Sequence, residues 1–273
     1  MTSGSLQLPS LAIVAGGGAF PDLVADEARA GGTKVLAVRL SGHAEPLTLS
    51  RTDGIWARPE QLGHIFAYLR GQGVRDLVLI GRMRRPRIFD LRPDMTTLRL
   101  LPQILWPLCA GGDDALLRAV RKMLEGEGFR LHSAQSFITG FVADKGVMGL
   151  LVPDASASTD IALGMEAARA HGARDAGQAV IVLNGVVIGR EGVDGTDVLI
   201  DAHGVAGAIL VKMAKPQQDR ALDLPSIGPD TIRRCAAKGF AGIAVEAGAT
   251  LVANKKQVID FANAHGLFLV GVT

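Results

Sequence analysis

The sequence predicts an α/β protein with two domains, and three observations support this class. Short apolar runs alternate with longer amphipathic segments along most of the chain, which is typical of strands and helices that follow each other in βαβ order. Hydrophobic residues make up 48% of the sequence and aromatic residues only 4%, so the core must consist mainly of aliphatic side chains, as in buried parallel strands. The length of 273 residues suits two domains of roughly 130 residues each.

The first half of the chain shows the alternation of strands and helices most clearly. An apolar run at 11–15 ends in three glycines, and Pro21 then opens a helix that continues to about residue 30. This order predicts a Rossmann-like parallel-sheet domain over residues 1–134. Its further strands and helices are expected at 34–40, 54–56, 59–71, 76–80, 95–108 and 113–126.

The second half, residues 135–273, predicts a mixed α/β domain. Two β-rich runs at 178–183 and 186–190 flank Asn184-Gly185, a pair that favours the type I′ turn of an antiparallel hairpin. The side chains expected to cap helices in this half are Ser158 or Thr159, and Thr196. Helices are expected at 159–171, from 198 onward, at 229–238 and at 255–265, and strands at 207–213, 242–246, 250–252 and 267–272.

Composition and charge exclude several classes of protein. A net charge of +2 gives no basis for nucleic-acid binding. Two cysteines and six scattered histidines are too few for a disulfide framework or a zinc site, so a metal would be a hard cation held by carboxylates. There is no signal-peptide pattern, and no apolar stretch approaches the roughly 20 residues of a transmembrane helix. We therefore expect a cytoplasmic protein.

Glycines follow two of the expected strands. Gly16, Gly17 and Gly18 come after the first strand, and Gly81 comes after the strand at 76–80. Ligands of parallel α/β sheets bind beyond the carboxyl ends of the strands, so these glycines are candidates for substrate binding that let a phosphate approach the backbone. Their spacing is not Gly-x-Gly-x-x-Gly, which disfavours a nicotinamide cofactor. A simple tight turn is the alternative interpretation.

Two charged segments of the second half supply the other candidates. In the first, Thr196 and Asp197 precede an apolar stretch, where they can hold a cation and a phosphate or simply cap a helix. In the second, Lys212 and Lys215 can neutralise phosphate oxygens, and Asp223 can activate water or bind magnesium. Of these residues, Thr196 and Lys212 are predicted to bind the substrate, and Asp197, Lys215 and Asp223 are predicted to be catalytic. A solvated loop is the alternative interpretation of the second segment.

Eight short motifs, each unspecific by itself, occur in order at residues 13–21, 61–63, 112–118, 175–180, 195–197, 212–216, 223–228 and 246–248. The most characteristic is Asp223-Leu-Pro-Ser-Ile-Gly. The ordered set spans nearly the whole chain and resembles the UDP-2,3-diacylglucosamine pyrophosphatase family of lipid A synthesis in certain Gram-negative bacteria, the type unrelated to metallophosphoesterases.

The resemblance implies a magnesium-dependent hydrolase whose two α/β domains hold a lipid-bearing substrate between them. In such an enzyme, water attacks the α-phosphate of the UDP group and releases UMP and 2,3-diacylglucosamine 1-phosphate. The family's essential aspartate, which organises metal and water, corresponds to Asp223, its paired lysines to Lys212 and Lys215, and its Gly-Thr-Asp motif to 195–197. The lipid substrate implies peripheral contact with the inner membrane, and a homodimer is compatible with the sequence.

Two other functions remain open from the sequence. A non-catalytic protein that binds UDP-sugars or a lipid precursor would bind the substrate without releasing UMP. A hydrolase of another nucleotide-sugar would act equally well on a substrate without acyl chains. The apolar segment 98–108 either lines a groove for the acyl chains or belongs to an ordinary helical core.

Overall fold

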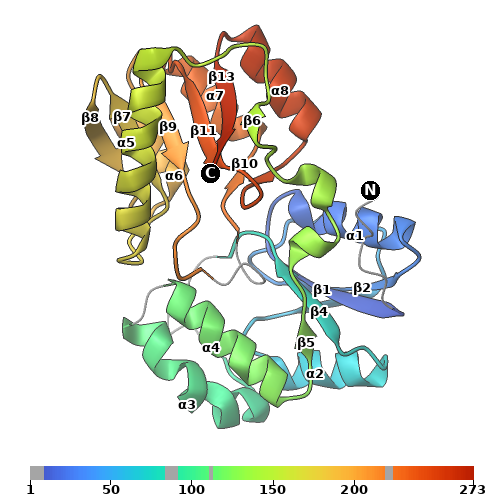
Figure 1. Ribbon diagram of the computed structural model, residues 1–273. Coiled ribbons are helices and arrows are strands. Elements are labelled where there is room, and N and C mark those ends of the chain that lie inside the picture. Colours follow the sequence, from blue (N-terminus) through green and yellow to red (C-terminus); the bar gives the residue numbers. More distant parts are fainter. Residues whose placement is uncertain (1–8, 84–91, 111–112, 219–223) are drawn as a thin grey trace. The chain divides into compact units, whose positions relative to one another are not determined.

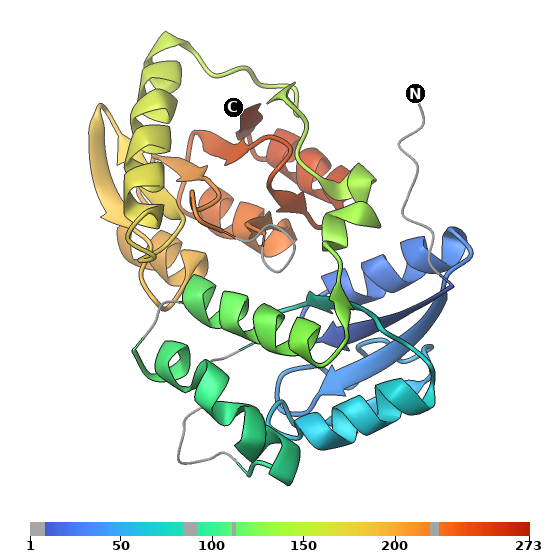
Figure 2. The same ribbon diagram turned by 60° about the horizontal axis from the view of Figure 1, so that its bottom comes forward.

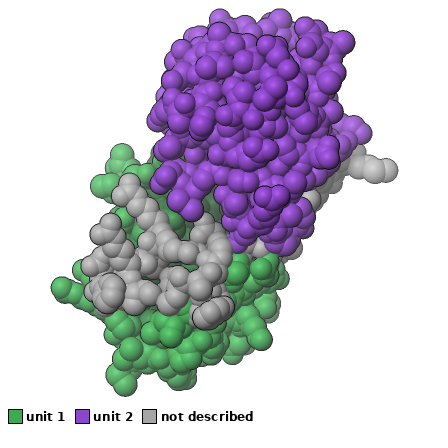
Figure 3. Space-filling view, turned by 90° about the vertical axis from the view of Figure 1, so that its left-hand side faces the viewer, with its two compact units in different colours: residues 1–139, 219–223 green, residues 140–218, 224–273 purple. Residues whose placement is uncertain are grey.

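The computed structural model of the protein describes residues 9–83, 92–110, 113–218 and 224–273 (Figure 1). The chain folds into two compact units, which are divided in the sequence between Thr139 and Gly140 (Figure 3). Unit 1 contains the described residues up to Thr139, and unit 2 contains those from Gly140 onward. Both units have the α/β architecture that the sequence predicts. None of the helices in the described part of the chain has the length and apolar character needed to cross a bilayer.

The sheet of unit 1 has five strands, all parallel, in the order β3-β2-β1-β4-β5. This confirms the predicted Rossmann-like parallel sheet, because the order reverses between β1 and β4 as it does in that fold. Buried aliphatic residues fill the central strands, as expected where helices cover both faces. The strands are β1 (Ser10–Ala15), β2 (Lys34–Leu40), β3 (Gly54–Ala57), β4 (Asp76–Ile80) and β5 (Arg130–Leu131).

In the described part of unit 1, the α-helices are α1 (Phe20–Ala30), α2 (Leu62–Gly71), α3 (Met95–Ala110) and α4 (Asp113–Gly126). Helices α1 and α2 lie on opposite faces of the sheet (Figures 1 and 2). On the face of α2, Phe66 and Leu69 pack with Leu36 of β2, Leu100 of α3 and Met123 of α4 in one buried cluster. The two helices α3 and α4 therefore extend the layer that α2 begins.

Helix α2 begins at Leu62, later than the sequence predicts, because its first N–H groups have a partner outside the helix. The carboxylate of Asp94 accepts hydrogen bonds from the backbone N–H groups of Gly63 (2.7 Å) and His64 (3.3 Å). The same carboxylate accepts from the backbone N–H of Thr97 in the first turn of α3 (2.8 Å). One carboxylate thus satisfies the orphan donors of two helices and ties them together.

The ends of β1 and β4 lie in direct backbone contact at the point where the strand order reverses. The N–H of Gly16 donates to the carbonyl of Ile80 (2.9 Å), and Gly17 and Arg82 exchange two backbone hydrogen bonds. A Cβ atom on Gly16 would lie 2.4 Å from the carbonyl oxygen of Arg82, and Gly81 has a φ of +107°. Close packing of two strand ends therefore accounts for Gly16 and Gly81.

The main sheet of unit 2 has six strands in the order β6-β13-β11-β9-β7-β8. Strands β9, β11 and β13 run parallel to one another. The antiparallel pairs are β6 with β13, β7 with β9, and β7 with β8. This confirms the predicted mixed sheet. Its strands are β6 (Gly146–Val147), β7 (Ala179–Leu183), β8 (Val186–Arg190), β9 (Ile209–Lys212), β11 (Gly242–Glu246) and β13 (Phe268–Val272), and a small separate sheet pairs β10 (Ser226–Ile227) with β12 (Leu251–Val252).

Helices cover both faces of the main sheet. Helix α5 packs on one face, where Ile161 contacts the cluster of Val180 and Val211. On the other face, Ile181 and Leu210 belong to the cluster formed by the remaining helices. Successive residues of β7 thus serve opposite faces, as the pleat requires. The helices are α5 (Ala155–Gly172), α6 (Thr196–His203), α7 (Pro229–Ala237) and α8 (Lys255–Ala264), and two short 3-10 turns, η2 (Ala134–Ser136) and η3 (Thr139–Phe141), precede them.

The predicted hairpin is confirmed, whereas both predicted hydroxyl caps are wrong. Asn184 and Gly185 have φ values of 51° and 78°, which the type I′ turn needs. Helix α5 begins earlier than predicted, because the side chain of Asp154 accepts from the backbone N–H of Ala157 (2.7 Å) and caps it. Helix α6 begins at Thr196 after Gly195 and has no side-chain cap.

Asp76 is a buried carboxylate that fastens the last strand of the unit 1 sheet. It accepts hydrogen bonds from Nε (2.8 Å) and a terminal nitrogen (2.6 Å) of Arg130 on β5, and its other contact is Nε2 of His132 (2.7 Å). The Arg130 guanidinium, and to a lesser extent His132, hold the pKa of Asp76 below its ordinary value despite the opposing effect of burial. The short strand β5 is therefore held by side chains as well as by its ladder.

We expect Asp76→Asn to lower the free energy of unfolding of unit 1 by about 2 kcal/mol at pH 7, because it removes a charge-assisted pair. The pKa of Asp76 is depressed in the folded state, so its contribution is complete above the unfolded value of about 3.9 and disappears as the pH falls through the folded value. Urea unfolding measured by tryptophan fluorescence checks this, since both tryptophans, Trp56 and Trp106, belong to unit 1. The exposed carboxylate of Asp26 is the control, and its asparagine variant should change stability by less than about 0.5 kcal/mol. Equal losses in the two variants would contradict the assignment.

We expect Gly16→Ala to lower the stability of unit 1 by about 1–3 kcal/mol, because the new methyl group meets backbone atoms that cannot rotate away. Gly71→Ala is the matched control, since no atom lies within 4 Å of the added Cβ at this helical position. The control should be neutral or slightly stabilising, because alanine favours helix more than glycine does. The same fluorescence measurement compares them, and a Gly16→Ala protein as stable as the wild type would show that the strand ends are not tightly packed.

Candidate functional site

A buried lysine lies at the carboxyl end of a central strand of unit 2. Lys212 ends β9, which runs between β7 and β11, and only 6% of the residue is exposed. Its ammonium donates hydrogen bonds to the hydroxyl oxygen of Thr196 (2.9 Å) and to the backbone carbonyl of Ser226 (3.0 Å). The structure thus brings together Lys212 and Thr196, two of the residues that the sequence predicts for substrate binding.

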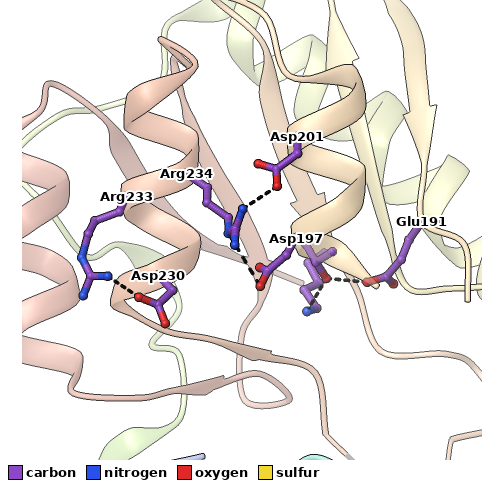
Figure 4. Close-up of polar contacts among 8 residues, drawn as sticks. Glu191, Asp197, Asp201, Asp230, Arg233 and Arg234 are labelled. Atoms are coloured by element: carbon purple, nitrogen blue, oxygen red, sulfur yellow. Dashed lines mark hydrogen bonds and ion pairs between the residues drawn. The ribbon is translucent and has the colours of Figure 1, made fainter. Parts of the chain in front are cut away.

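The hydroxyl group of Thr196 connects this lysine to a buried carboxylate. Thr196 donates a short hydrogen bond to one carboxylate oxygen of Glu191 (Figure 4). The other oxygen of Glu191 accepts from the backbone N–H of Gln178 (2.7 Å), and the residue is 6% exposed. An ammonium, a hydroxyl and a carboxylate therefore form one continuous chain of hydrogen bonds inside unit 2.

Lys215, a predicted catalytic residue, has different partners from Lys212. Its ammonium lies 2.5 Å from the carboxylate of Asp175, and its backbone N–H donates to the side chain of Gln218 (3.0 Å). The side chains of Lys215 and Asp175 are mostly buried, at 11% and 20% exposure. Asp175 has a φ of +56°, which is uncommon outside glycine and places this carboxylate in a tight turn after α5. The two lysines therefore occupy separate polar environments.

Asp197, also predicted to be catalytic, lies in the first turn of α6 and faces helix α7 (Figure 4). Its carboxylate is 3.7 Å from Nε of Arg234, which also binds the carboxylate of Asp201 (2.5 Å). The side chains of Asp197 and Arg234 are 46% and 40% exposed. Asp197 and Arg234 therefore belong to a partly solvated ion-pair network between α6 and α7. The carboxylate of Asp197 also interacts favourably with the positive N-terminal end of the α6 dipole.

Sequence reasoning did not name Glu191 or Glu246 as site residues, although Glu246 begins the motif at 246–248. Glu191 follows directly after β8, and Glu246 is the last residue of β11, where its carboxylate accepts from the backbone N–H of Ala214 (2.8 Å). Both are carboxylates at the ends of predicted strands, and that position was the available signal. A carboxylate at such an end faces the edge of the sheet where Lys212 also lies.

In unit 1, the glycine turn after β1 already has an internal acidic partner. The backbone N–H of Gly18 donates to the two carboxylate oxygens of Glu45 (2.9 and 3.2 Å), and Thr48 donates to the same carboxylate (3.2 Å). The hydrogen bond from Gly18 lowers the pKa of Glu45 below its ordinary value. The backbone N–H of Gly18, which would bind a phosphate at this turn, is therefore already hydrogen-bonded to the carboxylate of Glu45.

Asp223, predicted to be the catalytic aspartate and the magnesium ligand, lies outside the described residues. Within the described ranges, no group of three or more His, Cys, Asp or Glu side chains is arranged to hold a metal ion. Magnesium normally binds through carboxylates that share one site, whereas Asp175, Asp197 and Glu191 are engaged separately with a lysine, an arginine and a backbone N–H group. These residues therefore do not by themselves fit a magnesium site.

Comparison with known proteins agrees with the two-unit architecture and with the order of the motifs. Residues 10–141 match the family model described as the LpxI N-terminal domain, and residues 144–270 match the LpxI C-terminal domain. The chain is 35% identical to the UDP-2,3-diacylglucosamine pyrophosphatase LpxI of Caulobacter vibrioides over 96% of this chain and 97% of that protein. The chain therefore belongs to the LpxI family.

Proposed function

We propose that this protein hydrolyses the diphosphate bond of UDP-2,3-diacylglucosamine in lipid A biosynthesis. Water attacks the α-phosphorus of the UDP group, and the products are UMP and 2,3-diacylglucosamine 1-phosphate. The observation that carries this proposal is the full-length relationship to a protein named for this activity, which covers both units. The buried polar chain at Lys212 supports it, because a hydrolase of this kind needs a fixed positive charge beside a phosphate.

In the proposed reaction, Lys212 and Lys215 offset negative charge on the phosphate oxygens. Charge accumulates on these oxygens as the phosphorus is attacked, so a cation already held in position stabilises the transition state without reorganisation. Lys212 is held by Thr196, and Lys215 by Asp175. The burial of both lysine side chains strengthens their interaction with a phosphate, since screening by water is reduced.

Asp223 is the proposed base that activates the attacking water, and it stands in the motif that matches the family's essential aspartate. A requirement for magnesium is part of the proposal from the resemblance alone. Because the described carboxylates do not form a ligand set, no step is assigned to the metal. Of the other predicted site residues of unit 2, Thr196 is proposed to position Lys212 and Asp197 to shape the edge of the site.

The first test is turnover of UDP-2,3-diacylglucosamine in ¹⁸O-labelled water. We expect one labelled oxygen in UMP and none in the sugar phosphate, because the new bond forms at the α-phosphorus. Asp223→Ala should abolish UMP release while substrate binding persists, and Asp26→Asn, a change on the exposed surface, should leave the rate unchanged. A chelator should stop the reaction and added magnesium should restore it.

Other outcomes of this experiment would favour the alternatives. Wild-type protein that binds the substrate but never releases UMP would be a carrier. Equal turnover of a substrate without acyl chains would indicate a hydrolase of another nucleotide-sugar. Label in the sugar phosphate would contradict attack at the α-phosphorus, and turnover unaffected by chelation would remove magnesium from the proposal.

An exposed apolar face of α3 is the proposed contact for the acyl chains. Met95, Leu98, Pro102 and Leu105 are spaced three and four residues apart, so they form one stripe along the helix. Met95, Leu98 and Leu105 are exposed by 80%, 48% and 41%, whereas Leu100 faces the core at 4%. A stripe of this size facing water marks an interaction surface, and the proposed substrate carries two acyl chains of matching chemistry.

The lipid substrate also determines the proposed location of the protein. We propose that it works in the cytoplasm, in peripheral contact with the inner membrane from which the substrate comes. The homodimer stays a prediction that sedimentation at several protein concentrations tests.

We expect Leu98→Asp and Leu105→Asp each to raise KM for the acylated substrate about tenfold or more, because each removes roughly 1.5–3 kcal/mol of apolar burial. The value of kcat/KM for the same nucleotide-sugar without acyl chains should not change. Leu47→Asp is the control, since Leu47 is 79% exposed in the same unit and lies away from the stripe. Equal effects on both substrates, or an equal effect of the control, would show that α3 does not bind the chains.

A further inference from the structure

We infer that Glu191 is a positioning residue that acts on Lys212 through the hydroxyl group of Thr196. The inference rests on the proposed function, because it concerns the lysine that meets the phosphate. It adds a buried carboxylate to the site, and sequence reasoning alone did not point to this residue.

Glu191 is fixed at both its backbone and its side chain. Its carbonyl oxygen lies 2.6 Å from Nε2 of His171 on α5, and its carboxylate accepts from the backbone N–H of Gln178 (2.7 Å). A Cβ atom on Gly177 would lie 2.5 Å from the carbonyl oxygen of Glu191, so the backbone of Gly177 packs directly against Glu191. The carboxylate therefore has little freedom to move away from Thr196.

The hydrogen bonds in this chain can run in only one direction. An ionised carboxylate only accepts and an ammonium only donates, so the hydroxyl of Thr196 must donate to Glu191 and accept from Lys212. Glu191 thus fixes the rotation of the hydroxyl hydrogen and turns a lone pair toward the ammonium. Without the carboxylate, the hydroxyl hydrogen loses its fixed acceptor, and the position of the oxygen that accepts from Lys212 is less restricted.

Glu191 also supplies the negative charge that a buried cation needs. Lys212 is 6% exposed, and an ammonium removed from water is costly unless a carboxylate or strong acceptors compensate it. The carboxylate of Glu191 is one hydroxyl group away, near enough to compensate but not in direct contact. Glu191 therefore offsets part of the charge of Lys212 through Thr196, and the ammonium held in this way can act on a phosphate.

The alternative explanation is that Glu191 has only a structural role, in which its carboxylate connects Gln178 to the start of α6. Both explanations predict some loss of stability when Glu191 is changed, so stability alone does not separate them. They differ in turnover, because only a positioning role requires an effect that passes through Thr196 and Lys212. The deciding readouts are therefore the split between kcat and KM and the coupling to Lys212.

The experiment compares steady-state kinetics of the full-length wild type with the Glu191→Gln variant, using UDP-2,3-diacylglucosamine. Gln178 and Thr196 donate to different oxygens of Glu191, and the amide has an acceptor oxygen at only one of these two positions, so one of the two contacts is lost. We expect kcat to fall roughly 10- to 100-fold with a smaller change in KM, because displacement of a charged group matters most where charge accumulates in the transition state. Thr196→Val should cause a similar fall, and Thr196→Ser, which keeps the hydroxyl, should retain near wild-type kcat.

Asp160→Asn is the matched control for burial. Asp160 is a buried carboxylate of the same unit that accepts from the backbone N–H of Gly185 (2.6 Å) at the β7–β8 hairpin, away from Lys212. This variant should lose thermal stability without a change in kcat. A fall in kcat equal to that of Glu191→Gln would show that loss of any buried carboxylate slows the enzyme, and would overturn the inference.

The coupling test places Glu191→Gln in a Lys212→Met background. If Glu191 acts through Lys212, the second change adds little, so the double variant should turn over at about the rate of Lys212→Met alone. If the two substitutions instead lower kcat by independent factors that multiply in the double variant, the inference is overturned and Glu191 has only a structural role. If the Glu191→Gln variant does not fold, Thr196→Val takes its place in the double-mutant cycle with Lys212→Met and tests the same chain of hydrogen bonds. Failure of the proposed function itself would appear differently, as wild-type protein that releases no UMP.

Discussion

A positive charge held away from water at the end of β9 is the constraint on which the polar cluster of unit 2 depends. Strand β9 is central in its sheet, and its last residue, Lys212, is only 6% exposed. An ammonium in such a place needs acceptors. The start of α6 supplies the hydroxyl of Thr196, the loop before it supplies Glu191, and β10 supplies the carbonyl of Ser226. The stretch 191–196 before and at the start of α6, and Ser226 of β10, therefore converge on the cation at the end of β9.

The two units use the carboxyl ends of their parallel strands in different ways. In unit 2, the strand ends carry the charged groups Lys212 and Glu246, which side chains and backbone N–H groups hold in place. In unit 1, the strand ends carry Gly16 and Gly81, which allow two backbones to touch. Close packing explains these two glycines without a ligand, whereas Gly18 offers an N–H that Glu45 holds. Any anion that binds at Gly18 must therefore displace this carboxylate or bind beside it.

Much of the fold was predictable, because its signals are local. The bounds of β2, β4 and β11 follow from apolar runs that glycines or charged residues interrupt, and the hairpin follows from Asn184-Gly185. Strands β5, β6 and β10 have two residues each and were not predicted, because so short a pairing leaves no periodic pattern and depends on distant partners such as Asp76. The cap at Thr196 was wrong for a related reason: a capping hydroxyl accepts from a backbone N–H, and here the hydroxyl oxygen accepts from the ammonium of Lys212 instead.

The candidate site was predicted in part. Lys212 and Thr196 were identified from their residue types, and the structure joins them, but Lys215 and Asp197 have partners that no spacing in the sequence indicates. Glu191 was missed because a single carboxylate after a strand carries no motif, and its importance arises only from burial and contact with Thr196. The roles of these residues therefore rest on three-dimensional environment more than on sequence pattern.

In the proposed site, the ammonium of Lys212 faces a phosphate of the substrate. Calorimetric binding of UMP and of uridine to the wild type and to Lys212→Met tests it most directly, because the two ligands differ only in the phosphate. The account predicts that the variant, once shown to be folded, binds UMP roughly 10- to 100-fold more weakly and binds uridine with unchanged affinity. Unchanged affinity for UMP, or an equal loss for both ligands, would contradict it.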